Sequence, residues 1–249
     1  MSDNVNESRA TISVVTATRN AAKHLPKLIE SLRGQTDEDF EWVVADGASD
    51  DGTLELLRAV TDLNIVISSQ ADRGIYDALN RAIDQSSGEY YVVAGGDDIF
   101  YADAIENYRA AILRSHADII AADYKFGSRQ ISIKKGPSWL FGQSSFIAGH
   151  TLATAFKKDL HRLYGKYPER FPIGGDQFFV LTACKRGAGV YEAGFVAGEM
   201  GVEGVSSVDR IAVALEFFKV QLSVGSSFLI QSPLLVLRLL KIVMFERRP

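Results

Sequence analysis

The sequence predicts an α/β fold with a mostly parallel central sheet flanked by helices and a helical C-terminal tail. The first observation is that short β-branched and aromatic runs alternate with amphipathic helical stretches, which is the pattern of βαβ units. The second is that 249 residues with 47% hydrophobic content suffice for a core of ordinary size. The third is the single cysteine, which excludes an intrachain disulfide and a cysteine zinc cage.

The expected elements follow in order along the first half of the chain. Apolar runs rich in valine, isoleucine and tyrosine predict strands at residues 11–17, 41–45, 64–68, 89–94 and 118–122. Apolar residues three and four apart predict helices between them at 22–32, 53–60, 75–83 and 103–113. In a parallel sheet of this kind, ligands bind beyond the C-terminal ends of the strands.

Charge and motif content exclude several function classes. A net charge of −4 gives no general attraction to nucleic acid. The chain has no G-x-x-x-x-G-K-[ST] loop, no G-x-S-x-G elbow and no G-x-G-x-x-G after its first strand. The first fifteen residues lack the pattern of a secretory signal, so a cytoplasmic location is expected.

Polar residues follow each of the first four predicted strands, at 16–20, 46–53, 69–74 and 95–98. Turns and helix caps use the same residue types, so one such segment alone would be unremarkable. Asp97 and Asp98 are more informative, because two adjacent carboxylates after an apolar strand repel each other. A hard cation such as Mg²⁺ or Mn²⁺, shared with substrate phosphates, would relieve that repulsion.

Six segments, taken in order, resemble the inverting family 2 glycosyltransferases with the GT-A fold, in a bacterial branch that makes surface polysaccharides such as O-antigen or capsule. ATRN is similar to "PTYN", DGASDDGT to "DGxSxDGT", and SQADRGIYDALN to "SEPDKGIYDAMN". The stretch from GEY to GGDD is similar to "GEW…NSDD", HTLATAF to "HQATF", and GGDQF to "ASDYD". The chain departs from the pattern at Ala17, Arg19 and Gly95, and in the two residues after Asp176.

The resemblance implies roles for individual residues. A UDP- or GDP-sugar would be bound by Thr18, Arg19, Asp46, Asp72, Arg73, Gly74, Gly96 and Asp97. Asp97 and Asp98 would hold Mn²⁺ or Mg²⁺, and His150 would lie near the diphosphate or the acceptor. Asp176 would act as the general base for an acceptor hydroxyl, although its position also suits a helix N-cap.

The implied function is transfer of one sugar to a saccharide acceptor, expected to be lipid-linked, in surface polysaccharide synthesis. A non-catalytic nucleotide-sugar-binding protein is one alternative, given the departures at Gly95 and after Asp176. A sugar nucleotidyltransferase is a second, disfavoured because its glycine-rich basic signature is absent near the first strand. A processive synthase is disfavoured because it would need several clear membrane spans.

The expected organisation is a catalytic domain at 1–205 and a helical extension at 206–249. Residues 220–237 carry no charge, and their polar residues favour helices broken at Pro233 over a membrane span.

The extension is basic, with six Lys or Arg against three acids, so it carries about +3 and the remainder about −7. Arg238 and Lys241 lie three apart, where a surface-lying helix could keep both in water, so we expect a peripheral contact with the inner membrane. The alternative, given equal weight, is that the same leucines pack on the core or form a homodimer interface.

Overall fold

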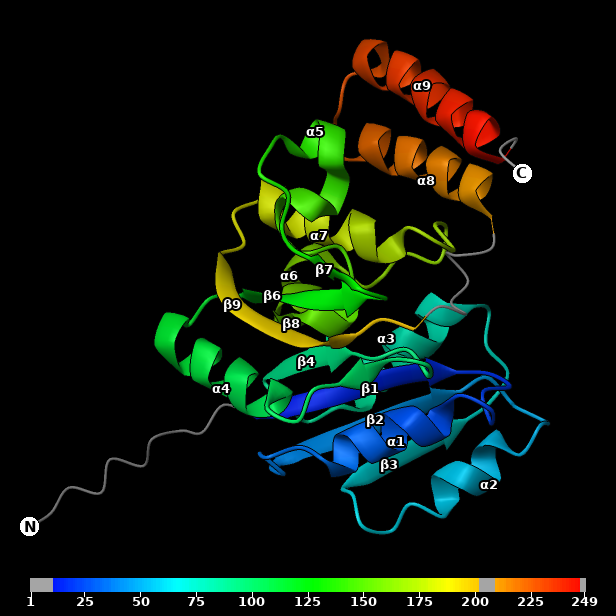
Figure 1. Cartoon of the computed structure of the whole chain (residues 1–249), viewed down its shortest axis with the longest axis vertical. Coiled ribbons are helices and arrows are strands. Elements are labelled where there is room, and N and C mark those ends of the chain that lie inside the picture. Colours follow the sequence, from blue (N-terminus) through cyan, green and yellow to red (C-terminus); the bar gives the residue numbers. More distant parts are fainter. Residues whose placement is uncertain (1–10, 202–208, 247–249) are drawn as a thin grey trace, which may run out of the picture.

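The computed structural model describes residues 11–201 and 209–246, and these form a mixed sheet with helices on both faces (Figure 1). The strands are β1 (Ile12–Thr18), β2 (Phe40–Asp46), β3 (Ile65–Ser69), β4 (Tyr90–Val93), β5 (Ile99–Phe100), β6 (Ile119–Phe126), β7 (Arg129–Ile131), β8 (Thr154–Lys157) and β9 (Val190–Glu199). Their order is β3-β2-β1-β4-β8-β6-β9-β5, and β7 pairs with β6.

The helices confirm the predicted alternation in the first half of the chain. They are α1 (Leu25–Arg33), α2 (Thr53–Arg58), α3 (Ile75–Gln85), α4 (Ala104–Ser115), α5 (Ser138–Phe141), α6 (Leu160–Tyr164), α7 (Gly175–Lys185), α8 (Arg210–Ser223) and α9 (Phe228–Glu246). Two short 3₁₀ turns, at Gly142–Ser145 and Thr151–Ala153, lead into β8.

The sheet is parallel only in part. The strands β3, β2, β1 and β4 run parallel, as the alternation of strands and helices predicts. The strand β8 then lies antiparallel between β4 and β6, while β9 runs parallel to β6. With four residues, β8 is too short to produce a period-two pattern that could be recognised in the sequence.

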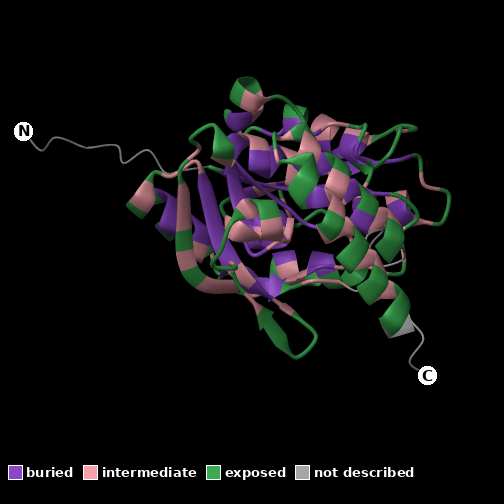
Figure 2. Ribbon diagram, turned by 90° about the horizontal axis from the view of Figure 1, so that it is seen from above, coloured by how far each residue is buried: buried purple, intermediate pink, exposed green. Residues whose placement is uncertain are grey.

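The register places the polar strand ends beside one another. Thr18 at the end of β1 pairs with Asp46 at the end of β2, and Asp46 pairs with Ser69 at the end of β3. The buried strands lie between two apolar layers (Figure 2). One layer includes α1 and α4, and the other includes α3 and α7. The sheet is therefore packed on both faces, and this packing positions the strand ends that carry the polar residues.

The C-terminal helices α8 and α9 lie side by side at the end of the molecule opposite α2 (Figure 1). They are anchored to α5 through buried amides, because Gln221 donates to the Ser138 carbonyl and Gln231 to the Trp139 carbonyl, at 2.8 and 2.7 Å. Within the described ranges, no helix combines the length and the apolar character needed to cross a bilayer.

Two expectations about the extension are wrong. The helices are not broken at Pro233, which lies inside α9; α8 ends at Ser223, and Gly225 with φ +84° makes the turn.

Arg238 is not held in water, since its guanidinium lies 3.9 Å from the Phe217 ring centroid and donates to the Leu140 carbonyl. Burial lowers the pKa of Arg238. The predicted boundary at 205/206, and the cations at positions 247 and 248, lie outside the described residues.

Candidate active site

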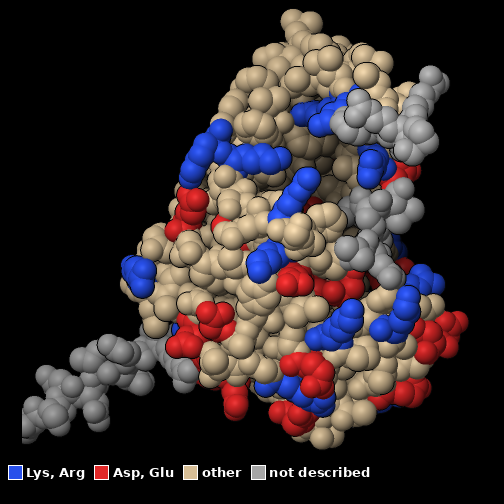
Figure 3. Space-filling view, viewed as in Figure 1, with Lys and Arg blue, Asp and Glu red and all other residues tan. Residues whose placement is uncertain are grey.

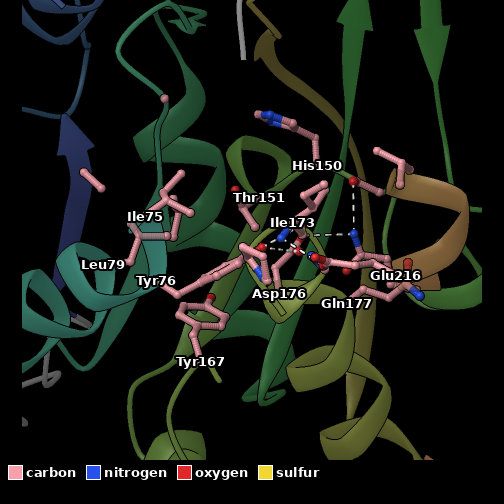
Figure 4. A pocket seen from close by; sticks show the side chains of 18 of the residues that line it. Ile75, Tyr76, Leu79, His150, Thr151, Tyr167, Ile173, Asp176, Gln177 and Glu216 are labelled. Carbon is pink, nitrogen blue, oxygen red and sulfur yellow. Dashed lines mark hydrogen bonds between the residues drawn. The ribbon is translucent and has the colours of Figure 1, made fainter. Parts of the chain in front are cut away.

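A cavity of about 350 Å³ opens beyond the C-terminal ends of β1 and β4, between α3, α7 and α8 (Figure 4). Its wall brings together two predicted site residues, His150 and Asp176, with residues that the sequence did not single out, including Tyr76, Gln143, Gln177 and Glu216.

Asp176 lies in the first turn of α7, and both of its carboxylate oxygens have protein partners. The Tyr76 hydroxyl donates to Oδ1 at 2.8 Å, and the Gln143 amide donates to Oδ2 at 3.1 Å. Burial, together with the charge of Asp176, raises the pKa of Tyr76 well above 10, so its hydroxyl remains a donor. The carboxylate is therefore held in one orientation toward the cavity.

The backbone just before Asp176 is held from two sides. The Tyr76 hydroxyl also lies 2.8 Å from the Ile173 carbonyl, on the side of α3. On the side of α8, Glu216 Oε2 accepts from the backbone N–H groups of Ile173 and Gly174 at 2.9 and 2.7 Å. A Cβ atom at Gly175 would lie 2.7 Å from the Tyr76 ring, so glycine permits this close approach.

The predicted metal-binding pair does not line the cavity, but Asp98 contacts two residues that do, Gly95 and His150. Asp98 is 1% exposed and accepts from the N–H groups of Gly95 and Gly201 at 2.7 and 2.9 Å. Burial raises the pKa of Asp98, and the nearby His150, with Nδ1 4.0 Å from Asp98 Oδ2, opposes that rise. The Asp97 carboxylate packs against Gly201, where a Cβ would lie 2.0 Å from its Cγ.

These carboxylates fit a hard divalent cation by their donor chemistry, because Mg²⁺ and Mn²⁺ prefer oxygen ligands. In the part of the chain that the structure describes, no three His, Cys, Asp or Glu side chains gather into a complete metal site. A cation held by Asp97 and Asp98 would therefore need oxygen ligands from the substrate as well.

Four of the predicted donor-binding residues adjoin one another at the strand ends: Thr18, Asp46, Asp72 and Gly96. Asp46 is fully buried and accepts from the Ser49 N–H at 3.0 Å and the Ser69 hydroxyl at 2.6 Å, so its carboxylate also holds the turn after β2. The turn is tight, because a Cβ at Gly47 would lie 2.3 Å from Asp72 Oδ2.

Thr18 completes this group, since its Oγ1 is buried, has no hydrogen-bond partner among the described residues, and lies 4.0 Å from where a Cβ of Gly96 would stand. Three other predicted donor-binding residues lie outside this group. Gly74 begins α3 with φ +127°, and its N–H donates to Asp72 at 3.0 Å. Arg19 is exposed. Arg73 lies at the surface, where it pairs with Asp77 and Glu169 at 3.2 and 2.9 Å, and these carboxylates raise its pKa.

Two glutamines on the cavity wall beside Asp176 were not assigned a role from the sequence. Gln143 Oε1 and Gln177 Nε2 are buried atoms that lack hydrogen-bond partners among residues 11–201 and 209–246.

An aromatic cluster beneath the cavity supports α7. The His161 ring stacks on Phe179 of α7 with centroids 4.4 Å apart, and its Nε2 lies 2.7 Å from the Tyr91 hydroxyl. Tyr91 in turn bonds the hydroxyl of Tyr167, which lines the cavity. Burial lowers the pKa of His161 to about 4.

The fold and the site lead to a class of protein, the glycosyltransferases, through a comparison with known families. Residues 13–172 match the family model described as Glycosyl transferase family 2, and the chain belongs to that family.

Among its relatives, a PGL/p-HBAD biosynthesis glycosyltransferase of Mycobacterium tuberculosis is 34% identical over 117 residues, which are 45% of each protein. Glycosyltransferase GlyG of Streptococcus pneumoniae is 28% identical over 161 residues, 55% of this chain and 54% of that protein. The chain thus spans about half the length of the curated relatives that it matches.

Solved structures agree on the architecture. S. aureus TarS 1–349 in complex with UDP-GlcNAc matches with a TM-score of 0.68 at 21% identity, covering 92% of this chain and 71% of that one. The mannosyltransferase PcManGT from Pyrobaculum calidifontis, in complex with GDP-Man and Mn²⁺, matches with a TM-score of 0.66 at 21% identity, covering 92% and 69%. The likeness confirms the predicted GT-A type of α/β fold.

The burial of His161 predicts a pH-dependent stability. Its pKa is about 4 when folded and near 6.5 when unfolded, so the unfolded chain binds the proton more tightly. Stability is complete above pH 6.5 and falls by about 3 kcal/mol as the pH drops to 4. H161F keeps the stack on Phe179 without titrating, and urea unfolding at several pH values should show a smaller loss for it. The exposed H116N, a control at a left-handed position that asparagine tolerates, should behave as wild type.

Proposed function

We propose that the protein is an inverting glycosyltransferase that moves a sugar from a UDP- or GDP-sugar to a hydroxyl of a lipid-linked saccharide acceptor, in the synthesis of a surface polysaccharide. The observation that carries the proposal is the Asp176 carboxylate, held by Tyr76 and Gln143 at the wall of a cavity beside the strand ends. The neighbouring folds in complex with UDP-GlcNAc and GDP-Man support a nucleotide-sugar donor.

In this mechanism the acceptor hydroxyl enters the cavity and transfers its proton to Asp176 as its oxygen attacks the anomeric carbon. The new glycosidic bond forms on the face opposite the leaving nucleoside diphosphate, so one in-line displacement inverts the configuration. Tyr76 and Gln143 keep the carboxylate aligned for this proton transfer.

The donor would lie across the strand ends, with its base and ribose near Thr18, Asp46 and Asp72 and its diphosphate toward Gly96. Arg19, Arg73 and Gly74 border this region. Asp97 and Asp98 would hold Mn²⁺ or Mg²⁺, and the bound cation would supply positive charge to neutralise the leaving diphosphate. His150, close to Asp98, suits a contact with the diphosphate.

We further propose that α9 lies on a membrane surface. Apart from Lys241, most of its exposed side chains are apolar and recur at helical spacing, and they include Leu229 (83% exposed), Val236, Leu237, Leu240, Val243 and Met244. The top of Figure 3 shows uncharged surface with a few Lys or Arg side chains beside it, whereas carboxylates gather over the lower half. The positive balance of the extension against the acidic remainder favours an anionic leaflet. A lipid-linked acceptor would present its hydroxyl at such a surface.

Replacing the base tests the mechanism most directly. D176N is nearly isosteric, so donor affinity should persist while transfer falls by about 10²–10⁴-fold. Release of nucleoside diphosphate with Mn²⁺, over a set of UDP- and GDP-sugars, measures the rate. D84N, an exposed carboxylate of α3, serves as the control. Near-native turnover by D176N would contradict the role, and the absence of any turnover by wild type would favour a binding protein without catalysis.

Removing a proposed metal ligand tests the cation. D97A deletes a carboxylate ligand of the cation without touching the core. Measured by titration calorimetry in Mn²⁺, its affinity for the nucleotide sugar should therefore equal the affinity that wild type shows in EDTA. D103A, an exposed aspartate at the start of α4, should keep the Mn²⁺ effect. If D97A retains the full Mn²⁺-dependent affinity, Asp97 is not a ligand.

If α9 contacts a membrane, replacing its exposed leucines should abolish binding to vesicles. Each leucine inserted among acyl chains contributes about 1.5–3 kcal/mol, so L237E/L240E should no longer sediment with phosphatidylglycerol vesicles while still binding donor. L113E, at an exposed leucine of α4, should sediment as wild type does. If intact protein ignores the vesicles and L237E/L240E converts a dimer to a monomer in size-exclusion chromatography, the face is a dimer interface instead.

A further inference from the structure

Glu216 is a buried carboxylate on an otherwise apolar face of α8. It is 9% exposed, and its neighbours on that face include Val213, Phe217 and Val220. Burying a carboxylate is costly unless hydrogen bonds replace its water. In this fold Glu216 makes such bonds with the backbone N–H groups of Ile173 and Gly174.

These two N–H groups belong to the entrance of α7. The first N–H groups of a helix have no partner inside it, and they form the positive end of its dipole. Of the two, only the Gly174 N–H belongs to this set, because Gly174 is the N-cap residue and Ile173 precedes it. A carboxylate from α8 therefore fixes the backbone that leads directly into the helix carrying Asp176.

The same stretch is held on its other side by Tyr76, whose hydroxyl lies 2.8 Å from both the Ile173 carbonyl and Asp176 Oδ1. The α8 helix also abuts the segment that carries Gln143, because a Cβ at Gly142 would lie 2.7 Å from the Phe217 ring. Displacement of α8 would thus disturb the peptide before Asp176 and the amide that bonds its carboxylate.

We propose that Glu216 is a positioning residue for Asp176, and that α8 in this way completes the active site. The proposal rests on the function proposed for Asp176. Glu216 acts through the backbone of 173–174, sets the place and direction of the Asp176 carboxylate, and leaves donor binding at the strand ends unaffected.

The first experiment separates positioning from donor binding and from folding. E216A removes the acceptor for both N–H groups, and we expect donor hydrolysis in Mn²⁺ to lose kcat by about 10²-fold while KM for the donor stays unchanged. E216Q keeps an oxygen that can accept both bonds and should restore most of kcat. K219A, an exposed residue on the same helix, should match wild type. Circular dichroism and thermal unfolding verify that each variant is folded.

A double-mutant cycle with D176N gives a readout that a merely structural role would not move. If Glu216 acts through Asp176, E216A costs little further rate in the D176N background. An equal fold-loss in both backgrounds, an unchanged kcat in E216A, or a raised KM with unchanged kcat would overturn the proposal. Full activity of D176N would instead refute the proposed base itself, whatever E216A does.

Discussion

The entrance of α7 is the constraint on which the candidate site depends. A general base is useful only when its carboxylate points at the reacting hydroxyl, and a misplacement of about 1 Å costs orders of magnitude in rate. Here the backbone before Asp176 donates to Glu216 of α8, and the carboxylate itself accepts from Gln143 and from the Tyr76 hydroxyl, which also lies 2.8 Å from the Ile173 carbonyl. Beneath the cavity, the His161 ring stacks on Phe179 and packs against the same helix.

The first half of the fold could be predicted because its information is local. Each strand of β1 to β4 is a short apolar run beside a helix with its own periodicity, and parallel pairing follows from that alternation. The second half could not, because β8 has four residues and its antiparallel place between β4 and β6 depends on long-range pairing. The predicted helix break at Pro233 was wrong because a proline inside a helix removes only one backbone N–H donor, and α9 continues through it. The chain turns earlier, at Gly225.

The candidate site was predictable to the extent that charge marks it. Asp97, Asp98, His150 and Asp176 fall in segments whose order resembles family motifs, and the fold brings these segments to one cavity edge. Tyr76 lay inside a quoted segment but carried no assigned role. Gln143 lies in a stretch of small polar residues without periodicity, so nothing local distinguishes it.

Glu216 did leave a signal, because it is a lone acid within AVALEFFKV, on the face that its neighbours bury. A buried acid needs hydrogen-bond partners in the fold, and Lys219, three residues further along α8, is exposed and does not supply one. That partner proves to be the backbone of 173–174, which no side-chain pattern could identify.

The C-terminal helices therefore have two faces with different requirements. One face of α8 lines the cavity, and the outer face of α9 is apolar and exposed. The faces are not independent, because Arg238 of α9 stacks on Phe217 of α8 and bonds the Leu140 carbonyl. Deleting residues 234–249 would remove that stack and loosen α8, so lost activity after deletion could not be assigned to lost membrane contact. Since Arg238 points inward, membrane contact by the described part of α9 would depend mainly on leucine, valine and methionine, and should be less sensitive to salt than a polybasic contact.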